Sequence, residues 1–145
     1  MINSILSVCI GNICRSPMAA GLLRSRLPGI ECNSAGLGAL VGRGADPLAI
    51  KVLENAGINI SDHRARQLDR AKVEASNLIL VMDEEQRREL LALFPTVRGK
   101  VFLLMPDQRT GIFDPYKLGQ KEFEECFALI NSGVDHWVGR LKKLQ

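Results

Sequence analysis

Short apolar segments alternate with helix-start signals along this chain, and this alternation limits the possible folds more than any other feature. Segments of this length, rich in apolar and β-branched residues and bounded by polar residues or glycine, are typical of buried strands. We expect strands at residues 2–8, 30–35, 76–82 and 100–104.

Each of the first three expected strands is followed by residues that commonly begin a helix. Ser16, as the N-cap, and Pro17, as the first helical residue, predict a helix that continues to residue 27. Further helices are expected at residues 48–56, behind an Asp46-Pro47 start, after Asp83, and at residues 122–144. The last of these shows apolar residues at helical spacing.

Strands that alternate with helices predict a parallel sheet with helices on both faces. We therefore expect a single α/β domain over residues 1–145, with a four-stranded parallel sheet in the order 2-1-3-4. Ligands of such sheets bind at the carboxyl ends of the strands. The site is thus expected at the turn after the first strand and at the loop over residues 105–121.

The composition is that of an ordinary globular protein and excludes several classes of function. Nineteen Lys and Arg against 16 Asp and Glu give a net charge of +3, too small and dispersed to indicate a nucleic-acid partner. No apolar run is long enough for membrane insertion, and the first residues lack a signal-peptide pattern, so we expect a cytoplasmic protein. The cysteines and the two histidines lack metal-ligand spacing, and neither a metal nor a cofactor is expected.

The turn after the first strand, Cys9-Ile10-Gly11-Asn12-Ile13-Cys14-Arg15-Ser16-Pro17, has the composition of an anion-binding cradle. In a strand-to-helix turn the backbone N–H groups point inward, and the helix N-terminus adds positive potential. Gly11 and Asn12 tolerate the left-handed backbone that a tight turn needs. Arg15 offers a planar fork that matches two phosphate oxygens.

Cys9 enters this cradle at the end of the strand, where the amides and Arg15 are expected to favour its thiolate form. A thiolate beneath a bound phosphate is placed for in-line attack on phosphorus. Ser16 could bond the sulfur and help it to leave. The competing interpretation is a structural cysteine beside an ordinary turn. The segment is not a Walker A loop, and Gly36 to Gly44 lacks the third glycine of a dinucleotide site, so a flexible rim loop is expected there.

Cleavage of an aryl phosphate also needs a proton donor for the leaving phenolate. Asp107 and Asp114 both lie in the loop after the fourth strand. From the residues alone either could serve, and Asp114 is favoured because Pro115 stiffens the backbone beside it. Asp-Pro is also a common turn pair, so a purely structural role is the alternative.

The cradle sequence through Met18-Ala19 resembles the active-site signature of the low-molecular-weight protein tyrosine phosphatases. The resemblance is strongest to the bacterial members of this family that act on tyrosine kinases of polysaccharide export. Ser34-Ala35-Gly36 and Asp114-Pro115-Tyr116 resemble the other two marks of that family. The resemblance covers essentially the whole chain. It implies a phosphotyrosine protein as partner and, for a bacterial member, an autophosphorylated tyrosine kinase.

The resemblance also implies roles for single residues. Cys9, Arg15 and Asp114 are the implied catalytic residues, and Ser34 is implied to support Asn12 by a hydrogen bond. The implied substrate-binding residues are Ile10, Gly11, Asn12, Ile13, Cys14, Ser16, Leu40 and Tyr116. Leu40 and Tyr116 would form the walls of an aryl pocket. Relatives that act on phosphoarginine carry Thr where this chain has Ile13, which favours phosphotyrosine here.

A reversible Cys9–Cys14 disulfide is implied as well, although Cys14 could equally be a passive core residue. Cys32 and Cys126 are interpreted as core residues, and His63 as a surface or interfacial residue without a catalytic role.

Two other functions compete with this interpretation. A thiol-based arsenate reductase shares the loop but needs further relay cysteines, and residues 76–100 contain none. A non-catalytic phosphate-binding or redox-sensing module would keep the cradle without the acid, and Asp114 argues against it.

Overall fold

Strand and helix alternate in the computed structural model, which describes residues 1–107 and 110–144. The elements in chain order are β1 (Ser4–Cys9), α1 (Arg15–Arg26), β2 (Glu31–Gly36), α2 (Pro47–Asn55), α3 (Arg70–Ala75), β3 (Leu78–Val81), α4 (Glu84–Leu93), the 3₁₀ helix η1 (Pro95–Lys100), β4 (Val101–Leu103) and α5 (Gln120–Leu144). Each observed strand overlaps the range that the sequence predicts.

The four strands form one parallel sheet in the order β2-β1-β3-β4, as predicted. The register pairs Cys9 with Gly36 on β2 and Val8 with Val81 on β3. Every residue of β3 is buried, which is the pattern of a central strand covered on both faces. The carboxyl ends of the central strands therefore meet beside Cys9.

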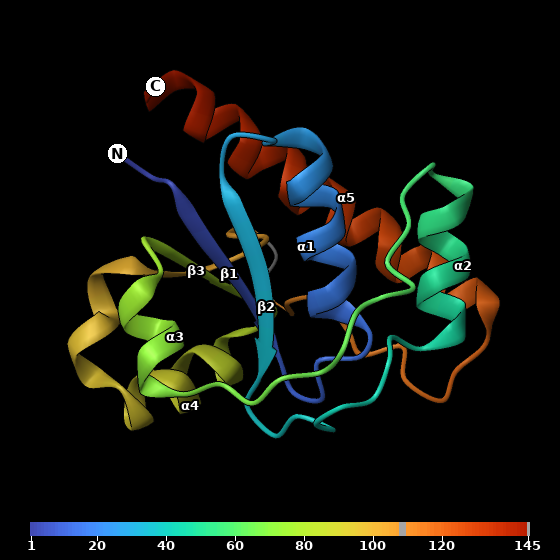
Figure 1. Ribbon diagram of the computed structural model, residues 1–145, viewed down its shortest axis with the longest axis horizontal. Helices are drawn as coiled ribbons and strands as arrows, with labels where there is room; N and C mark the ends of the chain where they lie inside the picture. The colour runs from blue at the N-terminus through green and yellow to red at the C-terminus, as the bar shows by residue number, and fades with distance from the viewer. Residues whose placement is uncertain (108–109, 145) are drawn as a thin grey trace.

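Helices cover both faces of the sheet, as expected from the alternation (Figure 1). Side chains alternate along β1, so that Ile5 and Cys9 join the core beneath α1, α2 and α5. Leu6 and Val8 point the other way, into a second core beneath α3, α4 and η1. Burial of this apolar surface on both faces is the main stabilising contribution to the fold.

Two helix starts follow from the sequence, whereas a third does not. Asp46 accepts a hydrogen bond from Leu48 N at the start of α2, and Asp83 accepts one from Gln86 N at the start of α4. The prediction that Ser16 is an N-cap is wrong. The helix α1 begins two residues earlier than predicted, at Arg15, and its N-cap residue Cys14 makes no side-chain capping bond.

The short helices α3 and η1 were not expected from the sequence. The helix α3 has 6 residues, too few for a helical repeat of apolar positions to be visible. Its one local signal is Asp69, which accepts a hydrogen bond from Lys72 N. Both helices pack their single buried valine, Val73 and Val97, into the second core.

The loop after β4 is held against the sheet and so positions the residues that follow it. Leu104 N donates to Val81 O, and Ile112 N donates to Met82 O, both at the carboxyl end of β3. The helix α5 is fastened to the same region, since Trp137 Nε1 donates to Leu104 O at 2.9 Å. Of the described helices, not one combines the length and apolar character that crossing a bilayer requires.

Candidate active site

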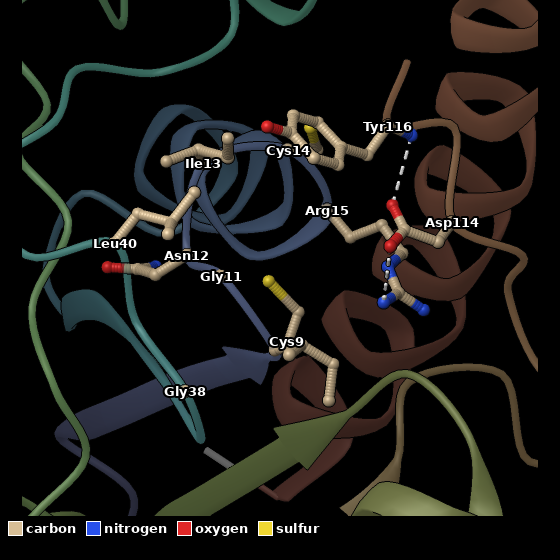
Figure 2. Close-up of a pocket in the computed structure, with 11 residues that line it drawn as sticks. Cys9, Gly11, Asn12, Ile13, Cys14, Arg15, Gly38, Leu40, Asp114 and Tyr116 are labelled. Carbon is tan, nitrogen blue, oxygen red and sulfur yellow. Dashed lines mark hydrogen bonds and ion pairs between the residues drawn. The ribbon is translucent and has the colours of Figure 1, made fainter. Parts of the chain in front are cut away.

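The turn between β1 and α1 lines a cavity of about 220 Å³ at the carboxyl edge of the sheet (Figure 2). Asn12 has a left-handed backbone, with φ of 60°, as expected. Gly11 does not: its φ lies outside the left-handed range, and a Cβ there would meet ordinary contacts at 3.8 Å. Because Cys14 makes no capping bond, the first N–H groups of α1 remain available to an anion.

The buried residue Asn12 ties the cradle together and connects it to two other segments, β2 and residues 63–66. Its Nδ2 group donates to Ser16 Oγ at 2.7 Å and to Ser34 Oγ at 2.9 Å, the second bond being the one expected from the family resemblance. Its Oδ1 atom accepts from Arg66 N at 2.9 Å, and its backbone oxygen lies 2.7 Å from His63 Nε2. These bonds satisfy the polar atoms of a fully buried amide and keep the left-handed turn in place.

Cys9 lies at the base of the cavity, with its sulfur pointing into it (Figure 2). Its Sγ atom is 2.9 Å from Ser16 Oγ. Since Ser16 Oγ already accepts a hydrogen bond from Asn12 Nδ2, its own hydrogen is free to be donated to the sulfur. The buried first turn of α1 thus supplies a hydrogen-bond donor to the thiol in addition to its backbone N–H groups.

Arg15 is buried and its guanidinium lies between three oxygen groups. The NH1 group donates to Ile112 O at 2.9 Å and is 3.8 Å from Asp83 Oδ2, and NH2 is 3.6 Å from Asp114 Oδ2. Its buried Nε group has no partner among the described residues. An unpartnered donor on a buried cation favours an oxyanion close by.

The structure separates the two candidate acids. Asp114 lines the cavity with its side chain 49% exposed, and its Oδ1 atom accepts from Tyr116 N at 3.1 Å. Asp107 is exposed and is not one of the lining residues. The other carboxylate oxygen of Asp114 faces Arg15, as the dashed line in Figure 2 marks.

The walls of the cavity are apolar. Leu40 and Ile13 stand on one side of the Cys9 sulfur, and the ring of Tyr116 stands on another (Figure 2). All the expected substrate-binding residues except Ser16 line the cavity, and Ser16 and Ser34 lie behind it through the bonds to Asn12. Gly38 lines the cavity too and was not expected.

The rim loop after β2, expected to be flexible, is instead tied to the cradle by three backbone hydrogen bonds. Leu37 N donates to Cys9 O, Gly38 N to Ile10 O and Leu40 N to Gly11 O, at 2.9 to 3.0 Å. Gly36 permits this approach, since a Cβ there would lie 2.3 Å from Ile10 O. The loop therefore holds Leu40 beside the cradle.

Burial governs the titration of the neighbouring groups. It raises the pKa of the Cys14 thiol, and the negative charges of Asp46 and Asp114 act in the same direction. Burial likewise raises the pKa of Cys126, a core residue, to about 12. For His63, burial lowers the pKa and the hydrogen bond to Asn12 opposes this in part. Cys14 is therefore a neutral thiol near pH 7, and all four cysteines are free.

The sequence analysis did not identify several residues that shape the site. His63 and Arg66 hold Asn12 from a segment more than 50 residues away, where nothing local indicates such a role. The sequence analysis used Asp83 only to mark the start of a helix, although its carboxylate also approaches Arg15. The position of Asp83, just after a buried central strand, could have indicated that it lies at the ligand-binding edge of the sheet.

Comparison with known proteins places these features in a family. The model of the family described as low molecular weight phosphotyrosine protein phosphatase matches residues 4–145. A probable low molecular weight protein-tyrosine-phosphatase, EpsP of Ralstonia solanacearum, is 51% identical over 144 residues, 99% of each chain. The low molecular weight protein-tyrosine-phosphatase Wzb of Escherichia coli K12 is 40% identical over 146 residues, covering 100% of this chain and 99% of Wzb.

A solved structure agrees with these sequence matches. The crystal structure of the Erwinia amylovora tyrosine phosphatase AmsI superimposes with a TM-score of 0.93 at 40% identity, over 97% of this chain and 93% of AmsI. Sequence and fold match over nearly the full length of these relatives, and the chain therefore belongs to the low molecular weight phosphotyrosine protein phosphatase family.

Proposed function

We propose that this enzyme hydrolyses phosphotyrosine in proteins through a cysteinyl-phosphate intermediate on Cys9. The observation that carries the proposal is the meeting of three groups in one cavity: the Cys9 thiol, the uncapped N-terminus of α1 and the carboxyl group of Asp114. An anion cradle with a sulfur at its base and an acid at its rim suits transfer of a phosphoryl group.

In the first step the Cys9 thiolate attacks phosphorus. An S–P bond forms, the P–O bond to the phenol breaks, and the protonated carboxyl of Asp114 gives its proton to the leaving oxygen. Arg15 and the backbone N–H groups of the cradle hold the equatorial oxygens. Binding of the phosphate would draw the guanidinium from Asp114, which lies 3.6 Å away, and so free this carboxyl to act.

In the second step the Asp114 carboxylate takes a proton from water, and the resulting hydroxide attacks phosphorus. The S–P bond breaks, inorganic phosphate forms and the thiolate of Cys9 returns. The hydroxyl of Ser16, 2.9 Å from the sulfur, donates to the leaving thiolate. Asn12 fixes the direction of that hydroxyl, because it occupies the acceptor side of Ser16 Oγ.

The shape of the cavity favours an aryl ester. Leu40, Ile13 and Tyr116 line the cavity around the sulfur, and apolar and aromatic walls of this kind suit an aromatic ring. Ile13 offers no hydrogen bond to a guanidinium, so we expect phosphotyrosine to be preferred to phosphoarginine.

The protein substrate that we propose is an autophosphorylated tyrosine kinase that controls polysaccharide export, as the resemblance to bacterial members implies. The similarity to the phosphatases EpsP and Wzb supports a substrate of this class. We place the reaction in the cytoplasm, where a nucleophilic thiol is kept reduced.

The test is hydrolysis of phosphotyrosine, phosphoserine and phosphoarginine substrates in the presence of EDTA. Wild type is expected to hydrolyse phosphotyrosine fastest. Cys9→Ser is expected to abolish turnover while still binding phosphate or vanadate, since the cradle is unchanged. Cys32→Ser, at a buried cysteine that does not line the cavity, is the matched control and is expected to remain active. Full activity of Cys9→Ser would overturn the proposal.

A further inference from the structure

Two hollows lie side by side on the surface near the end of α5. One, of about 250 Å³, is lined by Trp137 and Arg140 of α5 and by β4. The other, of about 370 Å³, is lined by Lys142 and by the turn between α1 and β2. Because Ile2 and Leu141 line both hollows, the two form one surface, which we call the terminal surface. It includes the apolar side chains of Met1, Phe102 and Leu144 and the cations Lys100, Arg140 and Lys142.

The terminal surface is positively charged. No Asp or Glu is found among the described residues that line its two hollows. Arg140 and Lys142 are exposed and make no ion pair within the described part of the chain, and Lys100 donates to backbone oxygens. Arg26 differs, since it pairs with Asp135. The surface therefore presents uncompensated positive charge, which favours a partner with a negatively charged surface.

Exposed apolar side chains stand among these cations. Phe102 is 44% exposed and Leu144 77%. The ring of Phe102 lies 5.6 Å from the ring of Trp137, and the guanidinium of Arg140 lies 5.7 Å from the centre of the same tryptophan ring. A surface that combines projecting apolar side chains with arginine and lysine is typical of proteins that lie in the headgroup region of a membrane.

The terminal surface lies away from the active site. Figure 1 shows the last turns of α5 beside the start of β1, whereas the turn after β1 lies at the opposite end of that strand. No residue that lines the active-site cavity also lines either hollow. A partner can therefore cover the terminal surface while the cavity stays open to a substrate.

We propose that the terminal surface docks this protein on a bilayer that is rich in anionic phospholipid. Arg140 and Lys142 contact the lipid phosphates, and Phe102 and Leu144 enter the region between the headgroups and the acyl chains. An acidic protein segment could also neutralise the cations, but it would need hollows that match the projecting side chains, whereas a fluid bilayer adapts to them. The docking is peripheral and does not depend on the proposed function.

The first measurement is co-sedimentation with vesicles. The protein is expected to bind vesicles of phosphatidylcholine and phosphatidylglycerol about tenfold more tightly than vesicles of phosphatidylcholine alone. Sodium chloride at about 1 M should weaken this binding, because it screens charges over about 3 Å. Binding that is equal for the two kinds of vesicle would overturn the inference. So would a lack of binding to both, which would leave an acidic protein segment as the occupant.

Variants test whether the terminal surface is the part that binds. Arg140→Gln/Lys142→Gln is expected to weaken binding about 25-fold, at about fivefold for each cation. The matched control Lys51→Gln/Lys121→Gln removes the same charge from exposed positions that line neither hollow, and it should retain most of the binding. An equal loss in both double variants would mean that net charge alone attracts the vesicles, and would overturn the inference.

The apolar contribution has its own pair of variants. Leu144→Ser should weaken binding about fivefold, whereas Leu93→Ser, at a side chain that is 55% exposed and lines neither hollow, should not. Circular dichroism checks that each variant is folded, and Lys142→Gln/Lys143→Gln replaces the first double variant if that one unfolds.

Trp137 reports on the orientation of the bound protein. It is the single tryptophan of the chain and it lines the terminal surface. Its fluorescence should be quenched by anionic vesicles whose acyl chains carry bromine, because docking brings the ring close to those chains. Bound protein without quenching would show that another face meets the membrane, and would overturn the inference.

Discussion

Ser16 occupies the first turn of α1, where it accepts a hydrogen bond from Asn12 and lies 2.9 Å from the Cys9 sulfur. A serine at this point of a sequence is normally taken for a helix cap. Here Cys14 is the N-cap residue but makes no side-chain capping bond, so the Ser16 hydroxyl can bond the thiol and the first amides of α1 remain available to an anion. At the scale of single residues, the site therefore depends on a helix N-terminus that lacks the usual side-chain capping bond.

Asp114 is the residue whose role can be tested most sharply. If it protonates the leaving phenolate, Asp114→Asn should lower kcat by about 10²- to 10⁴-fold. The loss should be largest for phenols of high pKa, which need the proton most, and smallest for p-nitrophenol. The measurement is kcat for a series of aryl phosphates.

Asp107→Asn is the control for this series, because Asp107 is exposed and does not line the cavity. It should behave as wild type with every leaving group. An Asp114→Asn enzyme as fast as wild type would show that the acid is another residue, and would favour a phosphate-binding module.

Cys14 should protect the nucleophile from over-oxidation. Hydrogen peroxide converts the Cys9 thiolate to a sulfenic acid, and the neutral Cys14 thiol can condense with it, losing water and forming a disulfide. Dithiothreitol should then restore the activity of wild type. In Cys14→Ser the sulfenic acid should proceed to the irreversible sulfinic acid, so that activity stays lost.

Activity assays after peroxide and then dithiothreitol make this comparison. Cys32→Ser, which removes a buried thiol away from the cavity, should recover like wild type. Equal recovery of Cys14→Ser would make Cys14 a passive core residue, the alternative that the sequence left open.

At the scale of elements, the end of β2 determines the position of the cradle. The backbone after Gly36 lies so close to β1 that three N–H groups of the rim loop donate to the oxygens of Cys9, Ile10 and Gly11. The isolated bridge between Gly36 and Gln67 ties the same point to the segment that carries His63 and Arg66. The cradle is therefore held from β2 as well as from its own flanking elements.

Gly36→Ala should disturb this arrangement. The added Cβ would lie 2.3 Å from the backbone oxygen of Ile10, so the cradle must shift. We expect a loss of about 1–3 kcal/mol in the free energy of unfolding and a marked fall in kcat. Urea denaturation and steady-state kinetics measure the two effects.

Gly99→Ala is the matched change, since its Cβ would meet no heavy atom within 4 Å. It should leave both the stability and kcat close to those of wild type. If Gly36→Ala behaved like Gly99→Ala, the close approach of β2 would not be what positions the cradle.

At the scale of the whole molecule, His63 links the stability of the fold to pH. Burial lowers its pKa in the folded protein, whereas in the unfolded chain it titrates near its ordinary value of about 6.5. As the pH falls below that value, the unfolded chain binds the proton first. The free energy of unfolding should therefore decrease until the folded form also becomes protonated.

His63→Gln should remove this component, because glutamine can donate to Asn12 O but does not titrate. Urea denaturation at pH values from about 7.5 down to about 5 should show a smaller loss for His63→Gln than for wild type. An identical loss in both proteins would mean that other groups account for the pH dependence.

Predictions from the sequence succeeded where the signal was local. The central strand over residues 78–81 is a continuous apolar run, and Asp46 and Asp83 are caps directly before their helices. Predictions failed where local signals were ambiguous or too short. Ser16 resembled a cap but lies two residues after the actual N-cap Cys14, and the 6 residues of α3 are too few to show a helical period.

The sequence by itself determined the alternation of strands and helices, and with it the parallel sheet whose carboxyl edge carries the cradle. It also placed Cys9, Arg15 and Ser16 within one short turn. Only the tertiary structure decided which distant groups complete that turn. Ser34, His63 and Arg66 reach Asn12 across 22, 51 and 54 residues, and Ile112 reaches Arg15 across 97. Such contacts depend on how the strands and loops pack together, and a local pattern of residues does not predict that packing.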